Sequence, residues 1–207
     1  MLVLLVGFSA TVCAQDKKGQ KESLFDGKSF SGWNGDTLKT WRITDGVIVG
    51  GSLTESVPRN EFLATNVSYQ NFILRLQFKM LGTEGFVNGG IQFNSQRIVD
   101  PPNEMTGYQA DLGKGYWGCL YDESRRNKVI AFADSQVVKQ VLKPNEWNDY
   151  EVRSEKGRIR IYINGKQTVD YTEPDPSIPQ SGLIALQVHG GGKVEVSYKN
   201  IYISKLD

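Results

Sequence analysis

The chain has 207 residues, a size at which an all-β sandwich commonly forms one domain with a substantial core. Its 24 Lys and Arg residues nearly balance 23 Asp and Glu residues, so the net charge of +1 excludes a strong field that would attract nucleic acid or an anionic membrane. Aromatic residues make up 11% of the chain and there are 22 glycines, which favours many strands joined by tight turns over long helices.

The N-terminal segment has the character of an export signal. Residues 1–14 are apolar and uncharged, and Ala14 supplies the small residue that signal peptidase requires before its cleavage site. We therefore expect a signal peptide over residues 1–14 and export to the periplasm or the extracellular space. The run is shorter than the ~20 residues that a bilayer requires, so no membrane span is expected. Cys13 leaves a lipidated cysteine open as an alternative.

Residues 15–23 are polar and rich in Lys and Gln, and we interpret them as a tether before a single domain over residues 24–207. After removal of the signal, Cys119 would be the only cysteine, so no internal disulfide is expected. With His189 as the single histidine, a cysteine-rich zinc site and a multi-histidine metal cage are both excluded. A divalent cation such as calcium, held by oxygen ligands, remains possible.

Alternation of apolar and polar residues with period two predicts strands from residue 41 onward. Asp45-Gly46 separates two short apolar runs, as in a β-hairpin. Phe72–Met80 is the clearest strand, because its even-numbered residues are all apolar. Asn164-Gly165, which can adopt the positive φ angles of a type I′ turn, follows the alternating residues 158–163. Further strands are expected at residues 183–188 and 194–203, about a dozen in total, enough for two packed antiparallel sheets.

Three of these strands carry amides, a carboxylate or an imidazole opposite their core face, where Lys, Thr or Glu would be ordinary. If the three strands are neighbours, these groups form one polar face whose paired donors and acceptors match sugar hydroxyls. The alternative is that they only solvate the sheet. Nearby aromatic rings could cover the apolar faces of a sugar. The polar residues are Gln92, Asn94, Gln109, Asp111, Gln187 and His189, and the aromatic residues are Tyr108, Tyr116, Trp117 and Tyr121.

A second candidate region is the stretch of residues 115–126, in which aromatic, acidic and basic residues are concentrated. Arg125 and Arg126 could donate paired hydrogen bonds to a carbonyl or a diol, and Glu123 could orient them or act as an acid or a base. A salt-bridged loop that supports the rim of a site is the alternative. Cys119 is expected to be a small buried residue rather than a nucleophile, because no base is adjacent in the sequence.

Several motifs of the chain occur in the order and spacing of a known family. Together they resemble the 3-keto-disaccharide hydrolase domain family, within the concanavalin A-like lectin/glucanase superfamily, from about residue 24 to the end. The motifs are Leu24-Phe25-Asp26-Gly27-Lys28, Gly32-Trp33, Asn88-Gly89-Gly90-Ile91, Gly107-Tyr108-Gln109-Ala110-Asp111, Glu146-Trp147-Asn148, Asn164-Gly165, residues 182–189 and Ile201-Tyr202-Ile203.

The resemblance implies an all-β, concanavalin A-like jelly-roll β-sandwich of two antiparallel sheets, exported by bacteria that degrade glycans. It also implies hydrolysis of glycosides already oxidised to a ketone at C3, with an oligosaccharide or oxidised disaccharide as substrate. One departure affects the site. Many members have Arg where this chain has Asn94, and Arg97, Arg125 or Arg126 could substitute for it.

The usual hydrolase mechanism on this fold requires two carboxylates on one strand, which this chain lacks around Asp111. A 3-keto sugar needs no such pair. Its ketone acidifies the proton at C2, so a base can expel the C1 aglycone by β-elimination, after which water adds to C1. We assign the base to His189 or Asp111, enolate stabilisation to Arg125 or Arg126, and protonation of the leaving oxygen to Glu123 or Tyr121.

Other side chains are expected to bind the substrate rather than react with it. A divalent cation on Asp111, Gln109 and Glu123 could replace the arginines as the electrophile. The alternative function is a non-catalytic, lectin-like carbohydrate-binding module on the same sandwich, because fold alone does not separate binding from chemistry. The residues expected to contact substrate are Gln92, Asn94, Gln109, Tyr108, Trp117, Tyr121 and Gln187.

Overall fold

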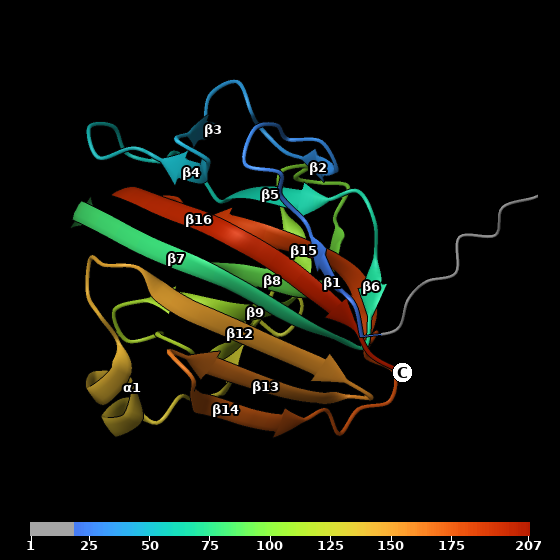
Figure 1. The fold of residues 1–207 in the computed structure, drawn as a ribbon. Helices are drawn as coiled ribbons and strands as arrows, with labels where there is room; N and C mark the ends of the chain where they lie inside the picture. The colour runs from blue at the N-terminus through green and yellow to red at the C-terminus, as the bar shows by residue number, and fades with distance from the viewer. Residues whose placement is uncertain (1–18) are drawn as a thin grey trace, which may run out of the picture.

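A computed structural model describes residues 19–207, in which two eight-stranded antiparallel sheets lie face to face (Figure 1). The predicted all-β sandwich is confirmed. Within the described residues there are 16 strands and one short helix, α1 (Ser135–Val141). No helix in this range is long and apolar enough to cross a membrane. The expected signal peptide, residues 1–14, lies outside the described residues.

The first sheet, sheet A, includes the predicted strand at Phe72–Met80, which extends to Gly85. Residues 21–23, expected as part of the tether, form a strand that pairs with the last strand of the chain, so the ordered domain begins before residue 24. The strands in spatial order are β14 (Lys166–Thr172), β13 (Arg158–Ile163), β12 (Asn148–Glu155), β7 (Phe72–Gly85), β16 (Gly192–Lys205), β4 (Val47–Gly51) and β3 (Trp41–Thr44), with β1 (Lys21–Ser23) beside β16.

The second sheet, sheet B, contains the three strands that carry the polar residues. They are neighbours, in the order β9-β8-β15, as the sugar-binding prediction requires. The spatial order of the whole sheet is β11 (Lys128–Ala131), β10 (Leu120–Glu123), β9 (Met105–Gly113), β8 (Asn88–Arg97), β15 (Ser181–Val188), β5 (Glu61–Thr65) and β2 (Trp33–Asn34), with β6 (Tyr69–Gln70) paired to β15.

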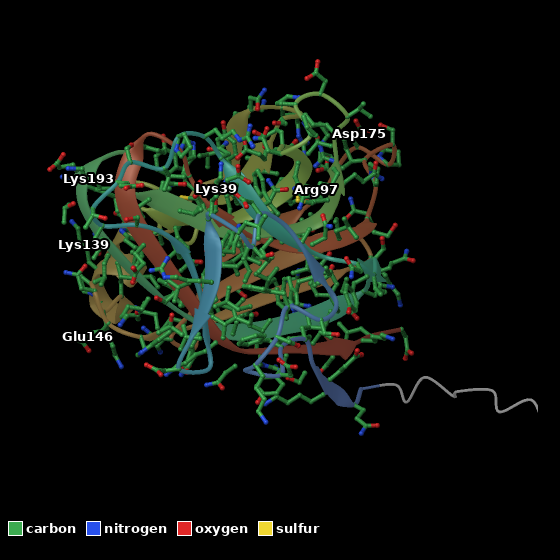
Figure 2. All side chains as sticks on the ribbon, turned by 90° about the horizontal axis from the view of Figure 1, so that it is seen from above. Lys39, Arg97, Lys139, Glu146, Asp175 and Lys193 are labelled. Carbon is green, nitrogen blue, oxygen red and sulfur yellow. The ribbon has the colours of Figure 1, made fainter. Side chains whose placement is uncertain are left out.

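The core lies between the two sheets and follows from the alternation of residues along the strands. Phe72, Leu74 and Leu76 of β7 are at most 4% exposed, whereas Arg75 points to solvent. Each such buried side chain stabilises the fold by about 1.5–3 kcal/mol relative to an exposed one. Side chains fill the space between the sheets, and charged groups such as Glu146 lie at the periphery (Figure 2).

The two predicted hairpins have the backbone conformation that their sequences demand. Asp45 and Gly46 have φ angles of 50° and 75°, and Asn164 and Gly165 have φ angles of 47° and 78°. Positive φ at both central residues defines a type I′ turn, whose twist matches that of the flanking strands. These turns join β3 to β4 and β13 to β14.

Two buried tyrosines connect sheet A to the backbone of sheet B. The hydroxyl of Tyr198 on β16 lies 3.1 Å from the carbonyl oxygen of Gly90 and 2.9 Å from that of Gln187. The hydroxyl of Tyr150 on β12 lies 3.1 Å from the carbonyl oxygen of Asp111. Because these carbonyls belong to β8, β15 and β9, the tyrosines support the polar strands from behind.

Candidate functional site

A pocket of about 90 Å³ lies on the outer face of sheet B, where β8, β9, β10 and β15 come together. Both carboxyl groups proposed for catalysis and the single histidine line this pocket. This volume is small beside the roughly 300–1,000 Å³ of a typical ligand pocket, so only part of a sugar can enter it. Its lining residues are Phe86, Asn88, Gln109, Asp111, Tyr116, Tyr121, Glu123 and His189.

The strand register explains how residues distant in sequence meet here. Gln109 on β9 pairs with Gln92 on β8 on one side and with Tyr121 on β10 on the other. Two residues further along β9, Asp111 pairs with Gly90 on β8, and Gly90 in turn pairs with Gln187 on β15. Gly90 leaves room for its neighbour, because a Cβ there would lie 2.7 Å from Cγ and Cδ of Gln109. The predicted tiling of the three strands is therefore confirmed.

The amide groups are much more deeply buried than an open sugar-binding groove would have them. Gln92 and Gln187 are 0% exposed and Gln109 is 1% exposed. Gln187 Nε2 on β15 donates a hydrogen bond to Glu123 Oε2 on β10 at 3.3 Å, so this contact spans the polar face of β8 and β9. Beside them Arg97 donates to the backbone carbonyls of Asn34, Phe62 and Asn103. The exposed face expected from the sequence is thus reduced to the pocket at one end.

Asp111 is the most deeply buried carboxyl of the pocket, at 3% exposure. Its Oδ1 accepts hydrogen bonds from Asn88 Nδ2 at 3.0 Å and from the Leu112 amide at 2.9 Å. Burial raises the pKa of Asp111 to about 7; these two hydrogen bonds oppose the rise and the charge of Glu123 adds to it. Asp111 can therefore both accept and release a proton near neutral pH.

Glu123 reaches the same pocket from β10. Burial raises its pKa to about 7, and the charge of the nearby Glu104 adds to the rise, while the hydrogen bond from Gln187 opposes it. Two carboxyl groups that interact in one small pocket do not ionise independently. Near pH 7 the pair holds about one proton, which is the state that combined acid and base catalysis requires.

The third ionisable group, His189, directly follows β15, and its backbone amide donates to the Asn88 carbonyl at 3.1 Å. Its Nδ1 lies 2.7 Å from the Gly190 carbonyl oxygen. Because a carbonyl oxygen only accepts, Nδ1 must carry the proton, and Nε2 of the neutral ring is left as a base. Phe86 packs edge-on against the imidazole at a centroid distance of 4.6 Å and holds the ring in place.

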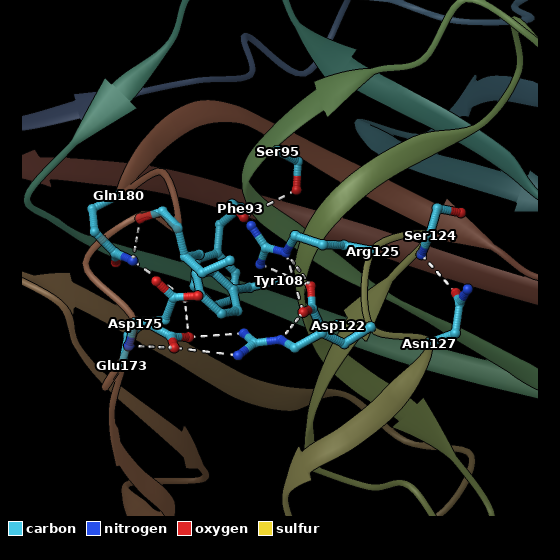
Figure 3. Close-up of polar contacts among 12 residues, drawn as sticks. Phe93, Ser95, Tyr108, Asp122, Ser124, Arg125, Asn127, Glu173, Asp175 and Gln180 are labelled. Atoms are coloured by element: carbon cyan, nitrogen blue, oxygen red, sulfur yellow. Dashed lines mark hydrogen bonds and ion pairs between the residues drawn. The ribbon is translucent and has the colours of Figure 1, made fainter.

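Arg125 and Arg126 do not line the pocket. Arg125 Nε donates to Asp122 at 2.8 Å, and Arg126 binds both Asp122 and Glu173 (Figure 3). Burial raises the pKa of Glu173, but hydrogen bonds from Arg126 and Tyr108 dominate and lower it to about 2. Asp122 is 0% exposed because its strand parity turns it away from the polar face. These ion pairs are those expected of the alternative, a salt-bridged loop that supports the rim of the site.

Five of the seven residues expected to contact substrate do not line the pocket. Gln92 and Gln187 are fully buried, and the other three lie elsewhere. Tyr108 alternates with Gln109 and faces the core, where its hydroxyl donates to Glu173 Oε2 at 2.6 Å. Trp117 stacks on the core residue Phe78 at a centroid distance of 6.0 Å. Asn94 lies at an irregular point of β8 with a φ of 47°, and its amide donates to Ser154 of the opposite sheet. The bulge reverses the parity that placed Asn94 on the face of Gln92.

The divalent cation considered above would have few acidic ligands. Within residues 19–207 no group of three or more His, Cys, Asp or Glu side chains is placed to hold a metal ion. The residues named for that cation, Asp111, Gln109 and Glu123, do line the pocket together, where they would offer two carboxyls and one amide oxygen.

Asn88 is a pocket residue that was not selected from the sequence. It is 2% exposed, orients Asp111 through its side chain and holds His189 through its backbone. Asn88 precedes Gln92 by four residues on β8, so its side chain is on the same face of the strand, and alternation along β8 could have identified it. Phe86 gave no such signal, because it belongs to the turn between β7 and β8.

Comparisons with known proteins agree with this architecture. The profile of a family described as "3-keto-alpha-glucoside-1,2-lyase-like domain" matches residues 20–204. A Parabacteroides distasonis ATCC 8503 protein described as a candidate glycosyl hydrolase is 26% identical, with a TM-score of 0.65 over 90% of this chain and 94% of that chain. A search of curated protein sequences finds no significant match.

Two further solved structures share the fold at lower identity. The carbohydrate binding module CBM66 from Bacillus subtilis has a TM-score of 0.65 at 18% identity and covers 84% of this chain and 96% of that chain. The Bacillus licheniformis beta-glucanase has a TM-score of 0.56 at 11% identity and covers 93% of this chain and all of that chain. These matches confirm the predicted concanavalin A-like jelly roll.

Proposed function

The chain belongs to the 3-keto-alpha-glucoside-1,2-lyase-like domain family, a glycosyl hydrolase-like group, and from that premise we propose that it cleaves 3-keto-glycosides. One observation carries the proposal: Asp111, Glu123 and His189 share a small pocket, and the two carboxyls have pKa values near 7. Such a pocket can supply a base and an acid at neutral pH without the carboxylate pair of an ordinary glycosidase.

In the proposed reaction His189 Nε2 removes the proton at C2 of the keto sugar. The electron pair of that C–H bond forms the enolate, whose oxygen derives from the C3 ketone. When the ketone re-forms, a C1–C2 double bond is made and the C1–O bond to the aglycone breaks. Water then adds to C1 and a proton returns to C2, so the net change is hydrolysis.

The carboxyl pair supplies the proton that the leaving oxygen takes. Glu123 is the more accessible of the two, and in its protonated form it is a general acid. Asp111 lies deeper in the pocket that it shares with His189, and as a carboxylate it would stabilise the imidazolium that forms when His189 accepts a proton. Asp111 remains the alternative base. Tyr121, whose pKa is raised mainly by burial, is a neutral donor available to the enolate oxygen.

An unpaired amide at the pocket wall supports recognition of a saccharide. Gln109 lines the pocket, and its Oε1 has no hydrogen-bond partner within residues 19–207. Buried polar atoms are normally satisfied, and sugar hydroxyls offer both donors and acceptors. The same observation favours the second candidate function, a carbohydrate-binding module, because amides bind sugars without performing chemistry.

Turnover separates the two functions. The purified protein should release aglycone from a 3-keto-glucoside and leave the unoxidised parent intact. Asp111→Asn, Glu123→Gln and His189→Gln should each lower kcat by at least about 100-fold, in the range of single acid or base groups. Glu146→Gln, at an exposed carboxyl outside the pocket, is the control and should retain full activity. Binding of an intact oligosaccharide with no release of any keto-glycoside would instead favour the binding module.

We also propose that the protein is exported, on the basis of the apolar, uncharged residues 1–14. Expression in a bacterial host followed by fractionation and N-terminal sequencing should give a mature chain beginning at Gln15 outside the cytoplasm. Uncleaved protein retained in the cytoplasm would refute export.

A further inference from the structure

A second hollow, of about 520 Å³, opens beside the catalytic pocket and shares two of its walls, Tyr116 and Tyr121. We call it the aromatic hollow. Its other walls come from β11 and the adjoining turns and include Phe132, Val129, Lys128 and Asn127. The catalytic pocket and the aromatic hollow therefore adjoin at Tyr116 and Tyr121.

Phe132 is the most unusual residue of this hollow. It directly follows β11, is 75% exposed and does not belong to the hydrophobic core. It also lines a third hollow, of about 300 Å³, whose walls include Trp117, Val138 and Cys119. Phe132 thus forms an apolar ridge between two adjoining hollows. An exposed aromatic ring that lines two hollows, one of them beside the reaction pocket, offers an apolar surface to a ligand.

The sizes of the pockets decide which part of a substrate can reach the hollow. The catalytic pocket holds only the reacting edge of a sugar, so the remainder of a glycoside must lie outside it. Asn88, Gln109 and Asp111, each at most 3% exposed, form the buried wall of the pocket. The shared tyrosines leave the aromatic hollow as the adjoining space for the group on C1.

We propose that the aromatic hollow is an aglycone site that prefers a flat aromatic aglycone, stacked on Phe132 and flanked by Tyr116 and Tyr121. This inference rests on the proposed cleavage of 3-keto-glycosides and specifies their class. Polar side chains occur in the hollow at Tyr116, Tyr121, Asn127 and Lys128, and a sugar ring can also stack on its aromatic walls. The preference for an aromatic group rests on Phe132, whose ring is 75% exposed. A flat aromatic ring covers more of that apolar surface than a sugar, whose hydroxyls must stay solvated or bonded.

The test compares methyl and 2-naphthyl 3-keto-glucosides of the same anomer. Phe132→Ala should lower kcat/KM for the naphthyl compound about tenfold, as expected for the loss of one aromatic contact, and change the methyl compound less than twofold. Because each substrate is compared with itself in wild type and variant, the difference in leaving-group reactivity cancels. Leu38→Ala, at a side chain that is 95% exposed and outside the hollow, should affect neither substrate.

Equal effects of Phe132→Ala on both substrates, or none on either, would overturn the aglycone site. A 3-keto-disaccharide whose kcat/KM falls as steeply as that of the naphthyl compound would overturn the preference for aromatic groups. If wild type cleaves neither substrate, the proposed function fails, and calorimetric titration then tests the hollow separately. Tighter binding of unoxidised 2-naphthyl glucoside than of methyl glucoside, lost in Phe132→Ala, would support it, and equal binding would overturn it.

Discussion

Replacement of the buried acid Asp111 by Asn should stabilise the protein at alkaline pH while abolishing its activity. The folded state raises the pKa of Asp111 from 3.8 to about 7, so folding favours the protonated carboxyl. A group of this kind contributes its full stability below pH 3.8, and that contribution is lost as the pH rises through about 7. Asn cannot ionise, and its Oδ1 can keep the hydrogen bonds from Asn88 and Leu112.

The size of the effect follows from the change in pKa. Each pH unit of difference corresponds to about 1.4 kcal/mol, so a rise of about three units gives about 4 kcal/mol. The free energy of unfolding of the Asn variant should therefore exceed that of wild type by less than about 1 kcal/mol at pH 4 and by about 4 kcal/mol at pH 8. With an m value of about 2 kcal/mol/M, the urea midpoint at pH 8 should increase by about 2 M.

Urea titrations followed by tryptophan fluorescence at pH 4, 6 and 8 measure this difference directly. The m value should stay the same, which shows that the extent of unfolding has not changed. Glu146→Gln, at an exposed carboxyl, should follow wild type at every pH. A stability difference that is the same at pH 4 and pH 8 would refute the claim that burial raises the pKa of Asp111.

Three further predictions test the pocket and its support. On the alkaline side, kcat/KM of wild type should fall with an apparent pKa near 7 as Glu123 loses its proton; a profile that stays level to pH 9 in stopped assays would contradict its role as the acid. Tyr198→Phe removes the hydroxyl that bonds the Gly90 and Gln187 carbonyls, and should lower the free energy of unfolding by about 1–3 kcal/mol in urea titrations. An unchanged midpoint would show that these contacts add nothing. Gly90→Ala places a Cβ 2.7 Å from the Gln109 side chain, so activity should fall more than stability does, as judged by kcat/KM and thermal midpoint measured together. Full activity would mean that the position of Gln109 is unimportant.

Local patterns in the sequence predicted most of the fold correctly. Residues 72–80 alternate so regularly that the strand and its buried face could be read directly, and β7 has that face. Asn164-Gly165 predicted a hairpin because few other pairs tolerate positive φ at both positions, and the turn is there. Both features depend on neighbouring residues along the chain, which is why sequence reasoning reached them.

Part of the candidate site could be predicted in the same way. Strand parity placed Gln109 and Asp111 on one face opposite Tyr108 and Ala110, and that alternation is observed. Parity failed at Asn94, because β8 contains a bulge there that reverses the face. It also could not reveal that Arg125 and Arg126 are bound by Asp122 and Glu173, since Glu173 lies 47 residues beyond Arg126.

The sequence by itself determined the all-β class, the hairpins and the face that each regular strand presents, because these follow from residue type and from a side-chain period of two. Only the tertiary structure decided that β9, β8 and β15 lie side by side, that Glu123 reaches across to Gln187, and that Asp111 and Glu123 are buried together. The physical reason is that a carboxyl pKa depends on desolvation and on nearby charge, both of which are set by residues distant in the chain.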